Sequence, residues 1–169
     1  MPMKGISEAG HETRENGGGA PEAAVRITAF CCNWCSYAGA DLAGTSRLSY
    51  PSEVKIIRIP CSCRVNPMFV LRALGRGADG VIVCGCHPGD CHYSTGNYYA
   101  RRRLKLFFSM LEFMGIEEER VRLEWVSAAE GVKFAKTMEE FTEGVRKLGK
   151  NTRIVDWRVA IYEGGERRP

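Results

Sequence analysis

The residues best suited to chemistry in this sequence are its cysteines. The chain of 169 residues has eight of them, and all eight lie between positions 31 and 91. They form three short clusters: Cys31, Cys32 and Cys35, then Cys61 and Cys63, then Cys84, Cys86 and Cys91. Thiolates bind zinc and iron-sulfur clusters, and they also carry out dithiol redox reactions. The clusters therefore predict a metal or redox site.

Three kinds of thiol site fit this spacing. Zinc prefers four tetrahedral ligands, and Cys32 with Cys35 and Cys86 with Cys91 form pairs of suitable spacing. An iron-sulfur cluster also needs about four thiolates but tolerates looser spacing. A thioredoxin-like dithiol centre would use Cys32 and Cys35 alone. Since structural zinc needs only four ligands, the excess of thiols favours iron-sulfur.

Other classes of function find little support. Neither of the two Gly-rich phosphate-binding motifs follows any expected strand, so ordinary nucleotide binding is not expected. No two carboxylates have a spacing typical of a general acid-base pair. The net charge of +4 is small, and the basic run at positions 101–103 fits a solvated helix face. We therefore expect no nucleic-acid partner.

The elements that position the cysteines alternate between strand and helix. Apolar runs predict strands at residues 25–32, 54–61, 80–84 and 121–127, and helices are expected at 36–48, 66–78, over a long segment ending near Gly115, and at 128–148. Four β-α units imply an α/β fold with a flavodoxin-like, doubly wound parallel sheet, for which we expect strand order 2-1-3-4. Because the carboxyl ends of parallel strands share one rim, the three cysteine clusters should converge there.

The helices should pack on this sheet through apolar residues at helical spacing. The expected core-facing residues are Phe69, Val70, Ala73 and Leu74, then Leu104, Phe107, Phe108, Leu111 and Met114, and finally Val132, Ala135, Met138, Val145 and Leu148.

The ends of the chain differ from this central domain. Residues 1–24 are expected to be a disordered leader, residues 25–149 an iron-sulfur-binding α/β domain, and residues 150–169 a β-prone C-terminal arm or edge strand. The sequence shows no signal peptide and no apolar run of the roughly 18 residues that span a bilayer. We therefore expect a cytoplasmic protein without a membrane span, whose thiols stay reduced.

The cysteines can be ranked as ligands. Cys35 lies at a helix entry, where peptide N–H groups favour thiolate, and Cys86 and Cys91 bracket a Pro-Gly turn that could bring them together. Cys61 should project from the second strand toward the same rim. Alternation along the first strand turns Cys31 and Cys32 to opposite faces, so at most one of them should be a ligand. The remaining two, Cys63 and Cys84, are expected to be buried or peripheral thiols.

Three further residues are candidates for contact with a cofactor. His87 and His92 each neighbour a cysteine, which raises a Rieske-like Cys2His2 alternative. Adjacent side chains tend to point apart, so we expect these histidines to hydrogen-bond to sulfur or to be exposed to solvent instead. Trp34 is expected to pack over it.

Two long motifs resemble a known family. They are residues 30–41 (FCCNWCSYAGAD) and residues 85–93 (GCHPGDCHY) with 96–98 (GNY), supported by the strand that ends in Cys61 and by residues 122–130 (RLEWVSAAE). Over about residues 25–149 the chain resembles the delta, or iron-sulfur, subunit of the methyl-viologen-reducing hydrogenase of methanogens and related archaea.

The resemblance implies a non-catalytic subunit that carries one [2Fe-2S] cluster in the metabolism of methanogenesis. It would relay electrons between a [NiFe] hydrogenase, or a formate dehydrogenase, and the flavin-containing A subunit of heterodisulfide reductase. The implied ligand candidates are Cys31 or Cys32, Cys35, Cys61, Cys86 and Cys91, whereas Cys63 and Cys84 lie outside the family motif. A zinc-stabilised structural adaptor and a Cys-x-x-Cys thiol oxidoreductase remain alternatives.

Overall fold

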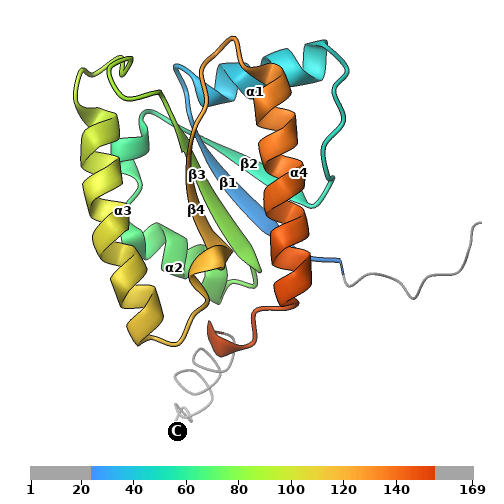
Figure 1. The fold of residues 1–169 in the computed structure, drawn as a ribbon, viewed down its shortest axis with the longest axis vertical. Helices are drawn as coiled ribbons and strands as arrows, with labels where there is room; N and C mark the ends of the chain where they lie inside the picture. The colour runs from blue at the N-terminus through green and yellow to red at the C-terminus, as the bar shows by residue number, and fades with distance from the viewer. Residues whose placement is uncertain (1–23, 155–169) are drawn as a thin grey trace, which may run out of the picture.

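The centre of the fold is an all-parallel sheet of four strands. The computed structural model describes residues 24–154. The strands are β1 (Ile27–Cys32), β2 (Val54–Ile59), β3 (Gly80–Gly85) and β4 (Val121–Trp125). Their order is β2-β1-β3-β4, so β1 and β3 are hydrogen-bonded neighbours (Figure 1). The predicted fold class and strand order are confirmed.

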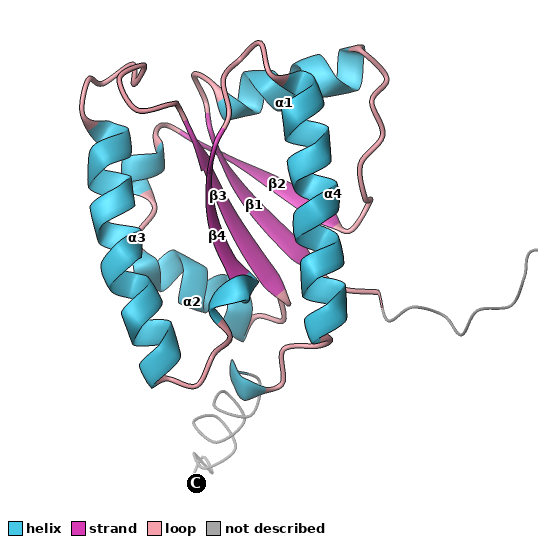
Figure 2. Ribbon diagram, in the orientation of Figure 1, coloured by secondary structure: helices cyan, strands magenta, loops and turns pink. Residues whose placement is uncertain are grey.

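Helices cover both faces of this sheet (Figure 2). They are α1 (Ser36–Thr45), α2 (Pro67–Gly75), α3 (Gly96–Phe113) and α4 (Gly131–Leu148), with short 3-10 helices η1 (Ser62–Arg64) and η2 (Glu118–Arg120). One face packs against α1 and α4, and the other against α2 and α3. Gly115 follows α3 with a φ of 68°, a left-handed conformation that suits glycine, and so ends the helix as predicted.

Strand β3 connects the two halves of the core. All six of its residues are buried. Val81 and Val83 pack with α2 and α3, whereas Ile82 and Cys84 pack with α1 and α4. This alternation is what a short, wholly apolar strand between two helical layers requires.

The buried faces of the helices are largely those predicted, but some residues predicted to face the core are exposed. Leu104, Phe107 and Leu111 are buried, but Phe69 and Val132 are 52% and 71% exposed. Met114, also predicted to face the core, is 38% exposed. Helix α4 instead buries Phe134 and Phe141 beside Ala135, Met138 and Val145. The prediction was wrong for Val132, because two aromatic side chains bury much more apolar area than Val132 would.

A buried arginine stabilises the end of the sheet that lies opposite the cysteines. Arg120 is 2% exposed and pairs with Glu117 at 2.8 Å. Its guanidinium also donates to the backbone oxygens of Asp79, Leu148, Gly149 and Lys150. These hydrogen bonds join the start of β3 to the end of α4, because one fully charged donor group satisfies several carbonyls there.

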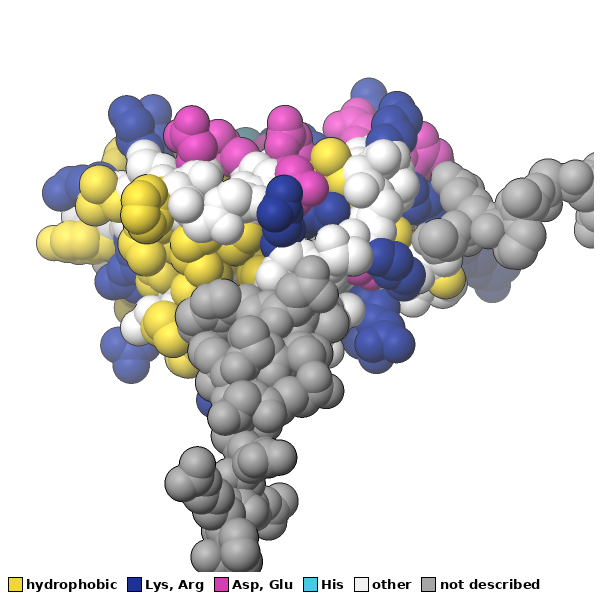
Figure 3. All heavy atoms as spheres, turned by 90° about the horizontal axis from the view of Figure 1, so that it is seen from below, with side chains coloured by type: hydrophobic (Ala, Val, Ile, Leu, Met, Phe, Trp, Pro, Cys, Tyr) yellow, Lys and Arg dark blue, Asp and Glu magenta, His cyan; other side chains and the backbone are white. Residues whose placement is uncertain are grey.

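Part of the surface over α2 and α3 is apolar. Met68, Phe69, Leu106, Met110, Phe113 and Met114 are each exposed by more than a third, and Phe113 by 93%. Viewed from below, hydrophobic side chains gather on this side of the molecule (Figure 3). We call these six residues the α2–α3 apolar surface. None of the described helices is both long enough and apolar enough to cross a membrane.

The two predicted end segments stay predictions. The leader lies almost wholly outside the described residues, which begin at position 24. Of the β-prone segment at 152–162, only residues up to Ile154 are described, and Ile154 is buried against the α2 side of the core.

Candidate metal centre

Three cysteines from two loops form a first buried group at the carboxyl end of the sheet. The sulfur atoms of Cys32, Cys35 and Cys86 all lie within 4.8 Å of one another, and those of Cys32 and Cys86 are 3.7 Å apart. All three side chains are at most 6% exposed. Since sulfur is a soft ligand and water is largely excluded, this group is suited to a thiophilic metal.

The strand order explains why these thiols meet. Cys32 is the last residue of β1, and Cys86 directly follows the adjacent strand β3. Cys35 precedes the first residue of α1, and the buried Ser36 hydroxyl donates to the Cys84 carbonyl at 2.8 Å, which fixes the start of α1 against β3. The buried Asn97 side chain donates to the carbonyl of Cys86 at 3.2 Å and so ties this loop to α3.

In the first group, the surroundings of Cys32 favour its thiolate form. A hydrogen bond from the Cys35 thiol lowers the pKa of Cys32 to about 5, and the Trp34 amide and the Cys86 thiol act in the same direction against the effect of burial. As the donor in this pair, and because it is buried, Cys35 has its own pKa raised. These contacts favour the thiolate form of Cys32, which is the form that binds metal.

A second group of sulfurs surrounds the first turn of α3. The sulfur atoms of Cys61 and Cys91 are 3.9 Å apart. A Cβ atom at Gly96 would lie 2.6 Å from the sulfur of Cys61, 3.0 Å from that of Cys91 and 3.4 Å from that of Cys63. Only glycine leaves room for three sulfurs at this point. Cys63 was expected to be a buried or peripheral thiol, and the structure places its sulfur beside those of Cys61 and Cys91.

The last two cysteines belong to the core. Cys31 on β1 and Cys84 on β3 are direct neighbours across the sheet, and both are fully buried. They pack on the α1 and α4 side, away from Cys32 and Cys86. The structure therefore does not bring Cys31, one of the two ligand alternatives on the first strand, to either sulfur group. Instead of one convergent set, the eight cysteines form two groups of three and a core pair.

The predicted tryptophan and histidines lie around these groups. Trp34 and His92 stack with ring centroids 3.7 Å apart, and the Trp34 indole donates to the Tyr93 hydroxyl at 3.3 Å. Trp34 is 47% exposed, so this stack reaches the surface above the cysteine loops. The first group consists of cysteines, and neither histidine is a member of it.

His87 connects two loops at this rim. Its Nε2 atom lies 2.7 Å from a carboxylate oxygen of Glu130, which also accepts the Ser127 N–H at 2.7 Å. The Ser127 N–H and then His87 lower the pKa of Glu130 to about 2. The carboxylate is therefore ionised at neutral pH, and it joins the loop after β3 to the loop before α4.

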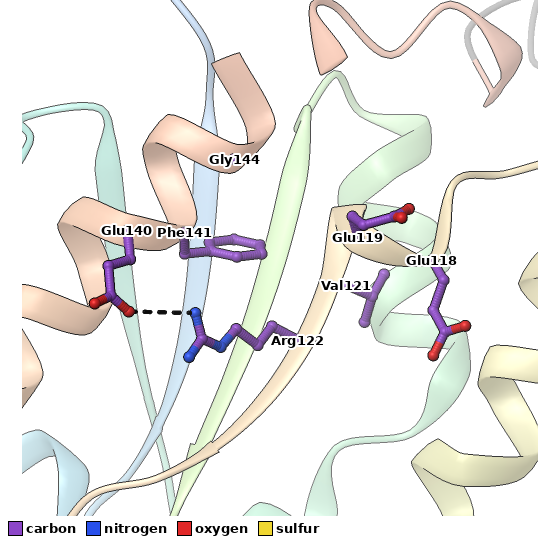
Figure 4. Close-up of a pocket in the computed structure, with 7 residues that line it drawn as sticks. All are labelled: Glu118, Glu119, Val121, Arg122, Glu140, Phe141 and Gly144. Atoms are coloured by element: carbon purple, nitrogen blue, oxygen red, sulfur yellow. Dashed lines mark ion pairs between the residues drawn. The ribbon is translucent and has the colours of Figure 1, made fainter. Parts of the chain in front are cut away.

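A separate pocket lies beside the beginning of β4 and contains no cysteine (Figure 4). Its lining residues are Glu118, Glu119, Val121, Arg122, Glu140, Phe141 and Gly144. Arg122 and Glu140 form an ion pair across it at 3.9 Å. The sulfur groups lie at the opposite end of the strands, so this pocket is not part of the candidate metal centre.

The sulfur spacings fit two thiolates on one tetrahedral metal. A tetrahedral metal with metal–sulfur bonds of about 2.3 Å places two thiolates about 3.8 Å apart. Both Cys32 with Cys86, at 3.7 Å, and Cys61 with Cys91, at 3.9 Å, have this spacing. The two pairs together offer four thiolates and Cys35 adds a third to the first group, so the donors suit zinc or an iron-sulfur cluster.

Comparisons with known proteins agree with this donor set. Residues 27–149 match the family "Methyl-viologen-reducing hydrogenase, delta subunit". The chain is 59% identical over 123 residues to the iron-sulfur D subunit of the F420-non-reducing hydrogenase of Archaeoglobus profundus, and the match covers 73% of this chain and 90% of the relative. It is 50% identical over 127 residues to the iron-sulfur D subunit of the vhc F420-non-reducing hydrogenase of Methanococcus voltae, covering 75% and 88%.

A different kind of relative contains the same region within a much longer protein. The A subunit of a ferredoxin/F(420)H(2)-dependent CoB-CoM heterodisulfide reductase of Methanosarcina acetivorans is 49% identical over 123 residues, which are 73% of this chain but 16% of that protein. The match to the family extends over nearly the whole described domain and includes both sulfur groups. This chain belongs to the delta-subunit family of methyl-viologen-reducing hydrogenases.

Proposed function

We propose that this chain is a cytoplasmic electron-transfer subunit that carries one [2Fe-2S] cluster. It relays electrons between a [NiFe] hydrogenase, or a formate dehydrogenase, and the flavin-containing A subunit of heterodisulfide reductase. The observation that carries this proposal is the pair of sulfur–sulfur distances, 3.7 Å and 3.9 Å, at the same rim of the sheet in a chain of this family.

Four cysteines would hold the cluster. Cys32 and Cys86 would bind one iron, and Cys61 and Cys91 the other, because each pair has the spacing of two thiolates on a tetrahedral metal. Cys35 lies within 4.8 Å of both members of the first pair and hydrogen-bonds to Cys32. Its proposed role is to stabilise negative charge on that sulfur, as hydrogen bonds to ligand sulfurs do in iron-sulfur proteins.

The protein supplies the surroundings of the cluster, and the cluster when bound supplies the storage of one electron. Burial of the ligand cysteines keeps water from the site. The Trp34 and His92 stack bridges the surface between the loops of the two groups, which gives the site a short route to a docked partner.

The partner assignment has two supports. Relatives named as hydrogenase subunits contain this domain as most of their length, and relatives named as the A component of heterodisulfide reductase contain it as 16% of theirs. A domain that is linked covalently to that component in some relatives is expected to contact it in others. The α2–α3 apolar surface has the character of a subunit interface.

The metal content of the anaerobically purified full chain tests the proposal. We expect iron and acid-labile sulfide in equal amounts and no stoichiometric zinc. The double variant C32A/C86A should lose most of the iron because one metal position is left without its two thiolates. The matched control is Cys84→Ala, which removes a buried thiol outside both groups and should retain iron.

Other results would favour the rival functions. Stoichiometric zinc without a redox signal would favour the structural adaptor. A reversible Cys32–Cys35 disulfide with reductase activity that survives replacement of Cys86 would favour the thiol oxidoreductase, for which the low pKa of Cys32 is suitable.

A further inference from the structure

We infer that Cys63 is a reserve ligand, which means a thiol that can take the place of Cys61 or Cys91 on the metal. The inference rests on the proposed cluster, and it concerns a cysteine outside the motifs that carry the family resemblance. Cys63 is one of three sulfurs at a metal position that needs two.

The backbone around Cys63 is fixed by several hydrogen bonds. It lies in η1, where the Arg64 N–H donates to the Cys61 carbonyl at 2.9 Å and the Val65 N–H donates to the Ser62 carbonyl at 3.1 Å. Arg103 of α3 donates to the Cys63 carbonyl at 2.6 Å and to the Val65 carbonyl at 3.2 Å. The turn therefore presents the Cys63 thiol in a defined position beside α3.

The Cys63 thiol points to the same place as the two proposed ligands. Its sulfur lies 3.4 Å from the point where a Gly96 Cβ would be, and the sulfurs of Cys61 and Cys91 lie 2.6 Å and 3.0 Å from that point. Both the backbone and the thiol of Cys63 also form hydrogen bonds with Cys61. The exchange that we infer requires a change of side-chain rotamer within this small space.

The exposure of Cys63 suits a reserve role. It is the one cysteine of the eight that is not buried. In the wild type its thiol lies at the edge of the site. If Cys61 or Cys91 were missing, Cys63 would hold the metal in its place as a thiolate, with the thiol proton passing to solvent. No electron would be gained or lost, and that metal position would again have two thiolates.

Pairs of variants in the full chain test this inference. We expect Cys61→Ala to retain most of the wild-type iron and sulfide but to show an altered electron paramagnetic resonance spectrum after reduction, because one ligand has changed. The double variant C61A/C63A should lose iron by roughly tenfold, since one thiolate remains for that metal position. Cys63→Ala alone should resemble the wild type in both measurements.

Circular dichroism will show whether Cys61→Ala folds. If it does not, replacement of Cys91 gives a second, independent comparison. C91A should retain iron, and C91A/C63A should lose it. The inference is overturned if the single variants lose as much iron as the doubles, or if Cys63→Ala alone loses iron. Wild-type protein without iron would instead refute the proposed function, and the two failures are thereby distinguished.

Discussion

At the scale of single residues, one geometric rule sorts the cysteines. Alternation along β1 and β3 turns Cys31 and Cys84 into the core and leaves Cys32 and Cys86 free to face each other beyond the strands. This rule could be applied from the sequence alone, and it predicted that Cys31 and Cys32 would separate. The position of Cys63 beside Cys61 and Cys91 could not be predicted from the sequence, because it depends on the path of the turn after β2 and on the contact of that turn with α3.

Glu130 gives a residue-scale prediction about pH. Its pKa is lowered from 4.5 to about 2, so the folded protein favours the carboxylate form. The resulting stabilisation is complete above about pH 4.5 and is lost as the pH falls toward 2. In urea titrations of metal-free protein, Glu130→Gln should therefore be less stable than wild type at pH 7, and the difference should shrink near pH 2.

The exposed Glu139, also on α4, supplies the control. Glu139→Gln should leave the urea midpoint close to that of wild type at each pH, since surface carboxylates contribute little. A loss of stability in Glu130→Gln that is the same at every pH would show that the His87 and Ser127 contacts do not act through the charge.

At the scale of elements, the sheet order does most of the positioning. Placing β1 next to β3 brings the first and third cysteine loops together, and this order was predicted from the sequence because it puts the first and third strands side by side. Helix faces were harder to predict. In α4 the apolar residues allow more than one core-facing stripe, and packing of Phe134 and Phe141 selected the one that leaves Val132 exposed.

Gly96 tests how closely the start of α3 fits the sulfurs. Gly96→Ala would place a methyl group 2.6 Å from the sulfur of Cys61, so either the helix or the thiols must move. We expect a loss of about 1–3 kcal/mol in the free energy of unfolding, together with reduced iron retention. Thermal unfolding and iron analysis measure the two effects.

Gly144→Ala is the matched control in another helix. No atom lies within 4 Å of the added Cβ, and alanine favours helix over glycine by about 1 kcal/mol, so this variant should be as stable as wild type or more stable. Iron retention in Gly96→Ala equal to that in Gly144→Ala would contradict the close packing of sulfur around α3.

At the scale of the whole molecule, the sulfur groups and the buried Arg120 lie at opposite ends of the sheet. The sulfur groups lie at the carboxyl ends of the strands, whereas the buried Arg120 joins η2, β3 and the end of α4 at the other end. The cysteines in the sequence predicted a site at the carboxyl ends of the strands. The role of Arg120 could not be predicted from the sequence, because a single arginine that follows a run of glutamates is typical of a surface position, and only the fold shows that it is buried.

Replacement of Arg120 should separate stability from metal binding. Arg120→Met leaves the buried Asp79 carbonyl and the partly buried Gly149 carbonyl without this donor, and we expect a loss of about 2–4 kcal/mol in the free energy of unfolding by urea. Iron content at low temperature should stay near that of wild type. Arg122→Met, a partly exposed neighbour that also pairs with glutamates, should cost less than about 1 kcal/mol. Equal losses in the two variants would refute the role of Arg120.

The central claim is that sulfurs from three loops hold a [2Fe-2S] cluster that accepts and gives up single electrons. Electron paramagnetic resonance of the anaerobic wild-type chain, before and after dithionite, tests it most directly. We predict no signal in the oxidised protein and, after reduction, one signal of a [2Fe-2S] centre that disappears on reoxidation. A folded protein that is silent in both states, or one whose signal persists in C32A/C86A, would contradict the account.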